Sequence, residues 1–218
     1  MSRFTIVDAE QRSDAWLAAR AGRATGSRAK DILAKIKSGE AAARRDYKMQ
    51  LVAERLIGAP QEDGYVNKEM LRGIEKEPDA IAAWEASTGL IARRTGFLAM
   101  TEYLAGCSVD GDIRDFEGLL EVKAPKTATH LGYLKLRRLP PEYEPQATHN
   151  MWVTGAKWLD FCSFDDRLPE DLQLLYVRVY RNELDIEGYE SEVLRFLKDV
   201  DDEIVAVNRL KGAHGIAA

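Results

Sequence analysis

Three residues, Asp110, Glu121 and Lys123, are of the types that together hold a divalent metal ion and activate a water molecule. Asp110 lies in a Ser-Val-Asp-Gly turn, and the other two follow on an apolar run that begins at Leu119. Residues two apart in a β-strand point to the same face. Glu121 and Lys123 would therefore present a carboxylate beside an ammonium group, with their Cα atoms about 6.6 Å apart. The turn would bring a second carboxylate to this face.

Hard cations such as Mg²⁺ take oxygen ligands and keep several waters. Two close carboxylates repel each other, so without a cation one of them tends to stay protonated. A metal ion removes that conflict, lowers the pKa of its bound water and holds phosphoryl oxygens. Lys123 could orient this water, or accept its proton if burial lowers the lysine pKa. The alternative is an ordinary surface hairpin with a salt bridge, and this short pattern alone does not exclude it.

The composition is that of a folded protein rather than a disordered or membrane-spanning one. The chain has 218 residues, 45% hydrophobic and 31% charged, and no apolar run long enough for a membrane span. Its start lacks the apolar core of a signal peptide. Two cysteines exclude a disulfide framework and a four-thiolate cluster, which favours a reducing compartment. The net charge of −5 argues against a nucleic-acid coat protein but permits a DNA enzyme with one basic concave surface.

The elements that must position these residues follow from periodicity and from turn residues. Helices come first, then a group of strands, a helix pair, two strands and a final helix, which predicts a mixed α/β core with an added helical front. Helices are predicted at 13–22, from 25 through 36, at 43–57 with Leu56 facing inward, from 67 to 89 with an interruption at Pro78, and at 127–138, 142–153 and 191–210. Strands are predicted at 90–94, 104–109, 119–123, 158–164 and 172–180.

A second group, Arg20, Thr25, Ser27 and Arg28, surrounds the start of the second predicted helix. A helix N-terminus offers free N–H groups and partial positive charge, so hydroxyls and a guanidinium there could bind a phosphate. The alternative is a plain N-cap by Thr25 or Ser27 with solvated arginines, and the residues alone favour that alternative.

Two other polar residues could belong to the same site. Glu77 directly precedes Pro78, and a carboxylate at a break in a helix could point into a cleft. Gln146 lies one helical turn before His149 and could bind a phosphate or a water near the metal. Ordinary solvated or polar helix faces would explain both. Four clusters of basic residues could add contacts to a phosphate backbone. These clusters are Lys35/Lys37, Arg44/Arg45/Lys48, Arg93/Arg94 and Lys135/Arg137/Arg138.

The order of these motifs resembles that of the phage lambda-type exonucleases, the YqaJ-like branch of the PD-(D/E)xK nuclease superfamily. The resemblance covers most of the chain. The chain departs from the superfamily pattern at two positions. At Val109 a proline is usual before the aspartate, and at Asn150 many relatives carry a tyrosine. The matching segments are Asp14-Ala-Trp16 with Arg20, Thr25-Gly-Ser27, Gly73 with Glu77, Cys107-Ser-Val-Asp110-Gly, Leu120-Glu121-Val-Lys123-Ala-Pro125, Tyr143-x-x-Gln146, Met151-Trp-Val-Thr154 and the closing acidic helix.

The resemblance implies a restriction-endonuclease-like core with a mixed central sheet, flanking helices and added N-terminal helices, and one nuclease domain over residues 1–218. It implies two Mg²⁺ ions, or Mn²⁺ in their place, bound by Asp110, Glu121 and the carbonyl group of Val122. Lys123 matches the catalytic lysine, and Glu77 and Gln146 match supporting residues of the active site.

The resemblance also implies how the substrate is bound. Arg20, Thr25, Ser27 and Ser108 match a pocket for the 5′-phosphate of a DNA end. Met70 matches an apolar wedge that separates the terminal base pairs, and Lys37 matches a basic residue that tracks the DNA.

By this resemblance the chain is expected to be a processive 5′-to-3′ exonuclease that degrades one strand of linear double-stranded DNA to mononucleotides. It would form a ring-shaped homotrimer and leave a 3′ tail for a single-strand annealing protein. A phage or prophage origin and the cytoplasm of a bacterial host are expected. The alternatives are a structure-selective endonuclease or resolvase of the same superfamily and a DNA-end clamp that does not cut.

Overall fold

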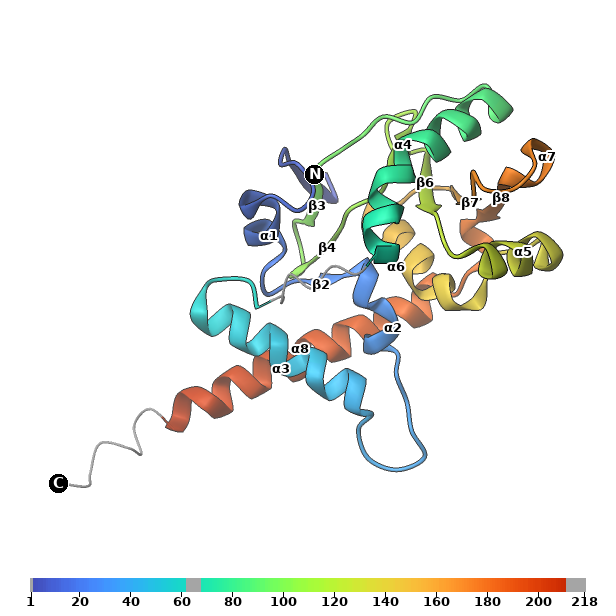
Figure 1. The fold of residues 1–218 in the computed structure, drawn as a ribbon. Helices are drawn as coiled ribbons and strands as arrows, with labels where there is room; N and C mark the ends of the chain where they lie inside the picture. Colours follow the sequence, from blue (N-terminus) through green and yellow to red (C-terminus); the bar gives the residue numbers. More distant parts are fainter. Residues whose placement is uncertain (1, 62–67, 211–218) are drawn as a thin grey trace.

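The computed structural model describes residues 2–61 and 68–210. The order of helices and strands confirms the predicted mixed α/β fold with helices near the N-terminus (Figure 1). The helices are α1 (Asp14–Arg20), α2 (Ala29–Ile32), α3 (Ala42–Ile57), α4 (Lys68–Thr88), α5 (Thr127–Leu136), α6 (Glu144–Thr154), α7 (Glu170–Gln173) and α8 (Ile186–Leu210), with 3₁₀ turns η1 (Gly26–Arg28), η2 (Pro141–Tyr143) and η3 (Arg181–Glu183). The strands are β1 (Phe4–Val7), β2 (Ala24–Thr25), β3 (Phe97–Met100), β4 (Ala105–Cys107), β5 (Gly111–Ile113), β6 (Gly118–Lys123), β7 (Trp158–Phe164) and β8 (Leu174–Tyr180).

The described strands form two four-stranded sheets rather than one central sheet. Their orders are β1-β3-β4-β2 and β5-β6-β7-β8. In the second sheet β6 is antiparallel to β5 and parallel to β7, with Glu121 opposite Phe161. The chain passes from the first sheet to the second through residues 108–110, between β4 and β5. Asp110 therefore lies at the junction of the two sheets.

Helices cover both faces of β6 and β7. Leu119 and Phe161 belong to a buried cluster that includes Trp152 of α6 and Phe196 of α8. Leu120 and Val122, on the opposite face, pack with Trp84 of α4. Figure 1 shows α3 and α8 crossing at the end of the molecule away from α4. Because side chains alternate along a strand, Glu121 and Lys123 share the face of Leu119, the face toward α6.

The structure corrects the predicted break at Pro78. Helix α4 runs continuously from Lys68 to Thr88 with Pro78 inside it. Proline removes one backbone hydrogen bond, and burial of Ala80, Ile81 and Trp84 against β6 and β7 stabilises the helix beyond it. The predicted start at residue 67 lies outside the described residues.

Several other predicted elements are also wrong in part. The strand expected at 90–94 is reduced to one bridge, between Arg93 and Asp112. The helix expected from 25 through 36 is the turn η1 followed by the single turn α2, and Ile36 is exposed. Leu56 is exposed rather than inward. Strands β1, β2, β3 and β5 were not predicted as such. None of the helices in the described ranges has the length and apolar character needed to cross a membrane.

Candidate functional site

Two hydrogen bonds join Asp110 to the second half of strand β6. Its backbone N–H donates to the Leu120 carbonyl at 3.2 Å, and its Oδ2 accepts the backbone N–H of Val122 at 2.7 Å. The N–H and C=O groups of one residue in a strand point to the same side. The carbonyl of Val122 therefore points toward the side occupied by Asp110, where β5 does not extend along β6.

Glu121 is 3% exposed and is held by three neighbouring side chains. Its Oε1 accepts Lys123 Nζ at 2.5 Å and Gln146 Nε2 at 2.7 Å, and its Oε2 accepts Asn150 Nδ2 at 3.1 Å. Gln146 and Asn150 lie one turn apart on α6, so the helix that covers this face fixes the orientation of the carboxylate. The sequence prediction included Gln146 but assigned no role to Asn150.

The carboxylates of this group resist ionisation in the metal-free protein. Burial raises the pKa of Glu121 to about 7, with the negative charge of Asp110 adding to the rise and Lys123 opposing it. Burial also raises the pKa of Asp110, again opposed by Lys123. Burial lowers the pKa of Lys123, but the attraction of Glu121 and Asp110 outweighs it and raises that pKa overall. A charged lysine favours orienting a water molecule over accepting its proton.

The oxygen atoms of this group fit a hard divalent cation. The carboxylates of half-buried Asp110 and buried Glu121 are close enough to repel each other, and the Val122 carbonyl points to the Asp110 side of the strand. A cation would relieve the electrostatic cost that raises both carboxyl pKa values. Among the described residues no three His, Cys, Asp or Glu side chains gather as a metal site. The remaining ligands would have to be water or substrate oxygen, which suits Mg²⁺ rather than Zn²⁺.

Glu77 lies beside this group in a cleft of about 430 Å³ whose lining includes Asp110, Arg94 and Arg12. Its Oε1 accepts Arg94 Nη2 at 3.2 Å. Burial raises the pKa of Glu77, and the charge of Asp110 raises it further. The structure thus places Glu77 next to a candidate metal ligand, although in a continuous helix rather than at a break.

Trp16 contacts both Arg20 and Ser108, and Arg20 in turn lies near Ser27. The Trp16 Nε1–H donates to Ser108 Oγ at 2.9 Å, and the Arg20 guanidinium lies over the Trp16 ring, 4.0 Å from its centroid. Arg20 Nη2 lies 3.5 Å from Ser27 Oγ. Ser108 precedes Asp110 by two residues, so this group adjoins the candidate metal ligands. We call Arg20, Ser27 and Ser108 the phosphate socket, after the role that the sequence analysis predicts for them.

Thr25 and Arg28 have other partners. The backbone N–H of Thr25 donates to Tyr47 Oη at 3.0 Å, and the Thr25 hydroxyl lies 3.4 Å from the same atom. Within the described chain neither residue caps the helix start with its side chain. Arg28 donates to Asp31 and Gln50 and stacks on the Tyr47 ring. Thr25 therefore supports the turn at residues 25–27, which we call the socket turn, and the Arg28 side chain is engaged by Asp31, Gln50 and Tyr47.

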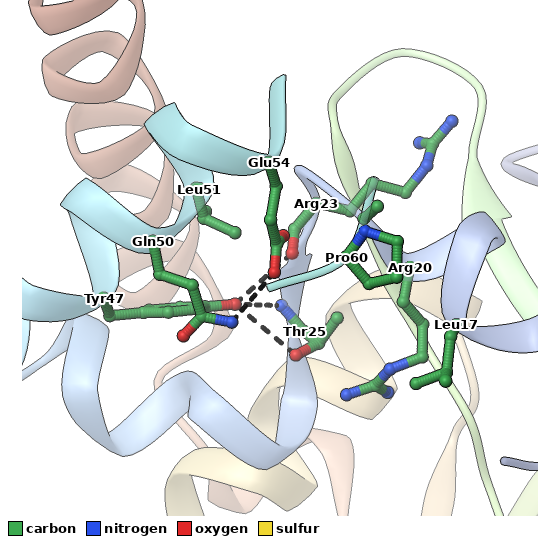
Figure 2. Close-up of a pocket in the computed structure, with 10 residues that line it drawn as sticks. Leu17, Arg20, Arg23, Thr25, Tyr47, Gln50, Leu51, Glu54 and Pro60 are labelled. Atoms are coloured by element: carbon green, nitrogen blue, oxygen red, sulfur yellow. Dashed lines mark hydrogen bonds between the residues drawn. The ribbon is translucent and has the colours of Figure 1, made fainter. Parts of the chain in front are cut away.

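Helix α3 holds the loop that carries the socket (Figure 2). The buried carboxylate of Glu54 accepts the Gly22 N–H at 2.7 Å and Gln50 Nε2 at 2.9 Å. Arg55 Nε donates to the Gly22 carbonyl at 2.7 Å. Gly22 has φ +70°, and an added Cβ would lie 2.6 Å from Arg55 Cγ, so glycine suits this close contact.

The remaining predicted residues lie on the surface. Lys37 is exposed in the connection between α2 and α3. Met70 is 50% exposed in the first turn of α4, about two helical turns before Glu77. Their roles in tracking and separating DNA stay predictions.

Comparisons with known proteins give consistent results. The model of the YqaJ-like viral recombinase domain matches residues 15–157, which include the candidate site. The crystal structure of an alkaline exonuclease from Laribacter hongkongensis, LHK-Exo, matches with a TM-score of 0.83 and 37% sequence identity, over 92% of this chain and 99% of that one. The same values hold for LHK-Exo in complex with dAMP.

A phage-related exonuclease from Haemophilus somnus 129PT matches with a TM-score of 0.65 over 85% of this chain and 96% of its own. At 18% identity this likeness shows the fold alone. None of the curated proteins matches the chain.

Proposed function

The chain belongs to the family of YqaJ-like viral recombinase domains, and on that premise we propose that it is a DNA exonuclease that uses Mg²⁺ to degrade one strand of linear double-stranded DNA from the 5′ end. The neighbouring positions of the phosphate socket and the candidate metal ligands carry this proposal. Ser108 of the socket and Asp110 lie two residues apart on the connection between β4 and β5. A terminal phosphate in the socket would place the next phosphodiester near Asp110, so the cut would fall close to the strand end.

Asp110, Glu121 and the Val122 carbonyl would hold the Mg²⁺ ions, with Mn²⁺ as a possible substitute. Bound metal would supply an activated water and stabilise the developing charge on the phosphate. Lys123 would orient the water, and Gln146 would keep the Glu121 carboxylate turned toward the metal. Glu77 would stay paired with Arg94 beside Asp110.

Release of 5′-mononucleotides is the product class that we propose. The relative LHK-Exo has been solved with dAMP, a deoxynucleoside monophosphate, which supports this choice. Arg20 would contribute a charge-assisted hydrogen bond to the terminal phosphate. This contact would distinguish phosphorylated from unphosphorylated ends.

We further propose, from the family resemblance, that the protein works processively as a ring-shaped homotrimer in the cytoplasm of a bacterial host. It would leave a 3′ single-stranded tail for an annealing protein. The mass of the protein by light scattering would test the trimer directly.

One time course tests the catalytic proposal. Linear duplexes with 5′-phosphate or 5′-hydroxyl ends and a covalently closed circle would be incubated with and without Mg²⁺. We expect mononucleotides from the phosphorylated ends in Mg²⁺ and no cutting of the circle. Cutting of circles as readily as of phosphorylated ends would instead favour an endonuclease or resolvase. Binding of ends without any cutting would favour a DNA-end clamp.

A further inference from the structure

Asn150 connects Glu121 to the phosphate socket through one buried side chain. Asn150 is 1% exposed on α6, and its Nδ2 donates to Glu121 Oε2 at 3.1 Å. The amide nitrogen faces Glu121, where it can donate to the carboxylate in the ionised form that would bind a metal ion. Lys123 and Gln146 occupy the other carboxylate oxygen, so Asn150 alone holds Oε2 among the described side chains.

The other end of the same amide faces the socket turn. A Cβ built on Gly26 would lie 2.4 Å from Asn150 Oδ1, so the backbone of Gly26 packs directly on this oxygen. Gly26 lies between Thr25 and Ser27 and begins η1. Any side chain at Gly26 would push either the turn or the amide out of place.

The side-chain oxygen of Asn150 would be unfavourable if the residue served only to fill space in the core. Asn150 Oδ1 is buried and accepts no hydrogen bond within the described part of the chain. A buried acceptor without a donor is destabilising, and an apolar residue of similar size would avoid that cost. What the amide provides in exchange for this cost is its N–H group at Glu121, while its oxygen packs closely on Gly26.

We propose that Asn150 is a positioning residue that sets the separation between the phosphate socket and the candidate metal ligands. The amide fixes the rotation of the Glu121 carboxylate on one side and the position of the Ser27 turn on the other. The inference rests on the proposed function and deepens it, because this separation determines how many nucleotides lie between the bound end and the cut.

The first test compares Asn150→Ala with Thr148→Ala. Thr148 is buried on the same helix, and its hydroxyl donates to the Glu144 carbonyl at 2.7 Å rather than to the site. Product lengths from 5′-phosphorylated duplex and the Mg²⁺ concentration for half-maximal rate would be measured. We expect Asn150→Ala to release a mixture of mono- and dinucleotides and to need more Mg²⁺, while Thr148→Ala keeps mononucleotides and the original requirement.

Unchanged product length and Mg²⁺ requirement in folded Asn150→Ala would overturn the inference while leaving the proposed exonuclease intact. Failure of the unaltered protein to release mononucleotides would instead contradict the proposed function. Asn150→Ser is a second, more polar variant with the same expected result, for use if the alanine variant unfolds.

A double-mutant cycle tests the contact with Gly26. Gly26→Ala should lower turnover on phosphorylated ends on the order of tenfold to a hundredfold, because a shift of about 1 Å near an active site can have such an effect. In the Asn150→Ala background the oxygen is gone, so Gly26→Ala should cost far less. An equal loss in both backgrounds would show that the amide does not link the socket to Glu121.

Discussion

The backbone N–H of Val122 donates to the Asp110 carboxylate at 2.7 Å, at the point where β5 no longer extends along β6. This bond turns the Asp110 side chain toward the strand edge, and the Val122 carbonyl points to the same side. A carboxylate oxygen from a turn and a carbonyl oxygen from a strand thus lie on the same side of β6. The charge of Asp110, rather than its shape, is the property that a cation would require.

Asp110→Asn should therefore abolish cleavage and spare binding of DNA ends. The substitution keeps the size of the side chain but removes a charged metal ligand, which is worth several kcal/mol and roughly a thousandfold in rate. Rates in Mg²⁺ and binding of a phosphorylated duplex would be measured in parallel. Asp115→Asn is the control, because Asp115 is 88% exposed in the neighbouring turn. Activity of the Asp110→Asn variant within tenfold of the original would contradict the metal assignment.

Arg20→Ala should reduce the preference for 5′-phosphorylated ends more than it changes the Mg²⁺ requirement. Loss of a hydrogen bond from a charged group costs about 1.5–3 kcal/mol, or roughly 10- to 150-fold in the ratio of the two rates. The ratio of turnover on phosphate and hydroxyl ends is the measurement. Arg195→Ala, which removes a 62% exposed arginine of α8, should leave the ratio unchanged. The socket assignment would fail if both variants had the same ratio.

The sequence predicted best what depends on neighbouring residues. The pairing of Glu121 with Lys123 follows from strand alternation, and β7 was predicted with its observed ends. The start of the first predicted helix at residue 13 is equally local, and Ser13 is the N-cap of α1. These features need no knowledge of the rest of the fold.

Residue types and spacing alone did not predict contacts between distant segments, and only the family resemblance grouped Ser108 with Arg20 and Ser27. Trp16 reaches Ser108 across 92 positions, and nothing in either segment identifies the other. In the sequence, Asn150 is one of several polar residues in a predicted helix, and only the packing of α6 on β6 brings it to Glu121. The strand Phe97–Met100 is short and uniformly buried, so it shows no alternation, and its pairing with β1 joins opposite ends of the first hundred residues.

Binding of Mg²⁺ should weaken as the pH falls below about 7. Burial raises the pKa of Glu121 to about 7, so the metal-free carboxyl group is protonated below that pH and ionised above it. A cation must displace the proton, so affinity should fall by about tenfold per pH unit on the acid side. Calorimetric titration at about pH 6 and about pH 8 measures this.

Glu117→Gln serves as the control for that titration. The Glu117 side chain is 36% exposed and pairs with Lys157, which lowers its pKa, so its removal should leave the pH dependence unchanged. Glu121→Gln should bind Mg²⁺ weakly at every pH. Equal affinity of the unaltered protein at both pH values would contradict the role of Glu121.

Stability should fall on acidification because His149 is buried in its neutral form. Its Nε2 lies 2.9 Å from the Gly106 carbonyl, which only accepts, so Nε2 carries the proton, and Nδ1 accepts the Tyr189 hydroxyl at 2.7 Å. Burial lowers the pKa of His149 from 6.5 to about 4. Since the folded value is below the unfolded one, its stabilisation is complete above pH 6.5 and is lost as the pH falls toward 4.

The lowering of the His149 pKa from 6.5 to about 4 corresponds to about 3 kcal/mol in the free energy of unfolding. Urea unfolding of the unaltered protein and of His149→Gln across this pH range isolates the contribution, since every other titrating group is common to both. The difference between the two free energies should shrink as the pH falls, because glutamine does not titrate. Parallel curves would mean that the buried ring is already protonated, in which case a backbone carbonyl and a tyrosine hydroxyl would be stabilising a cation at the centre of the core.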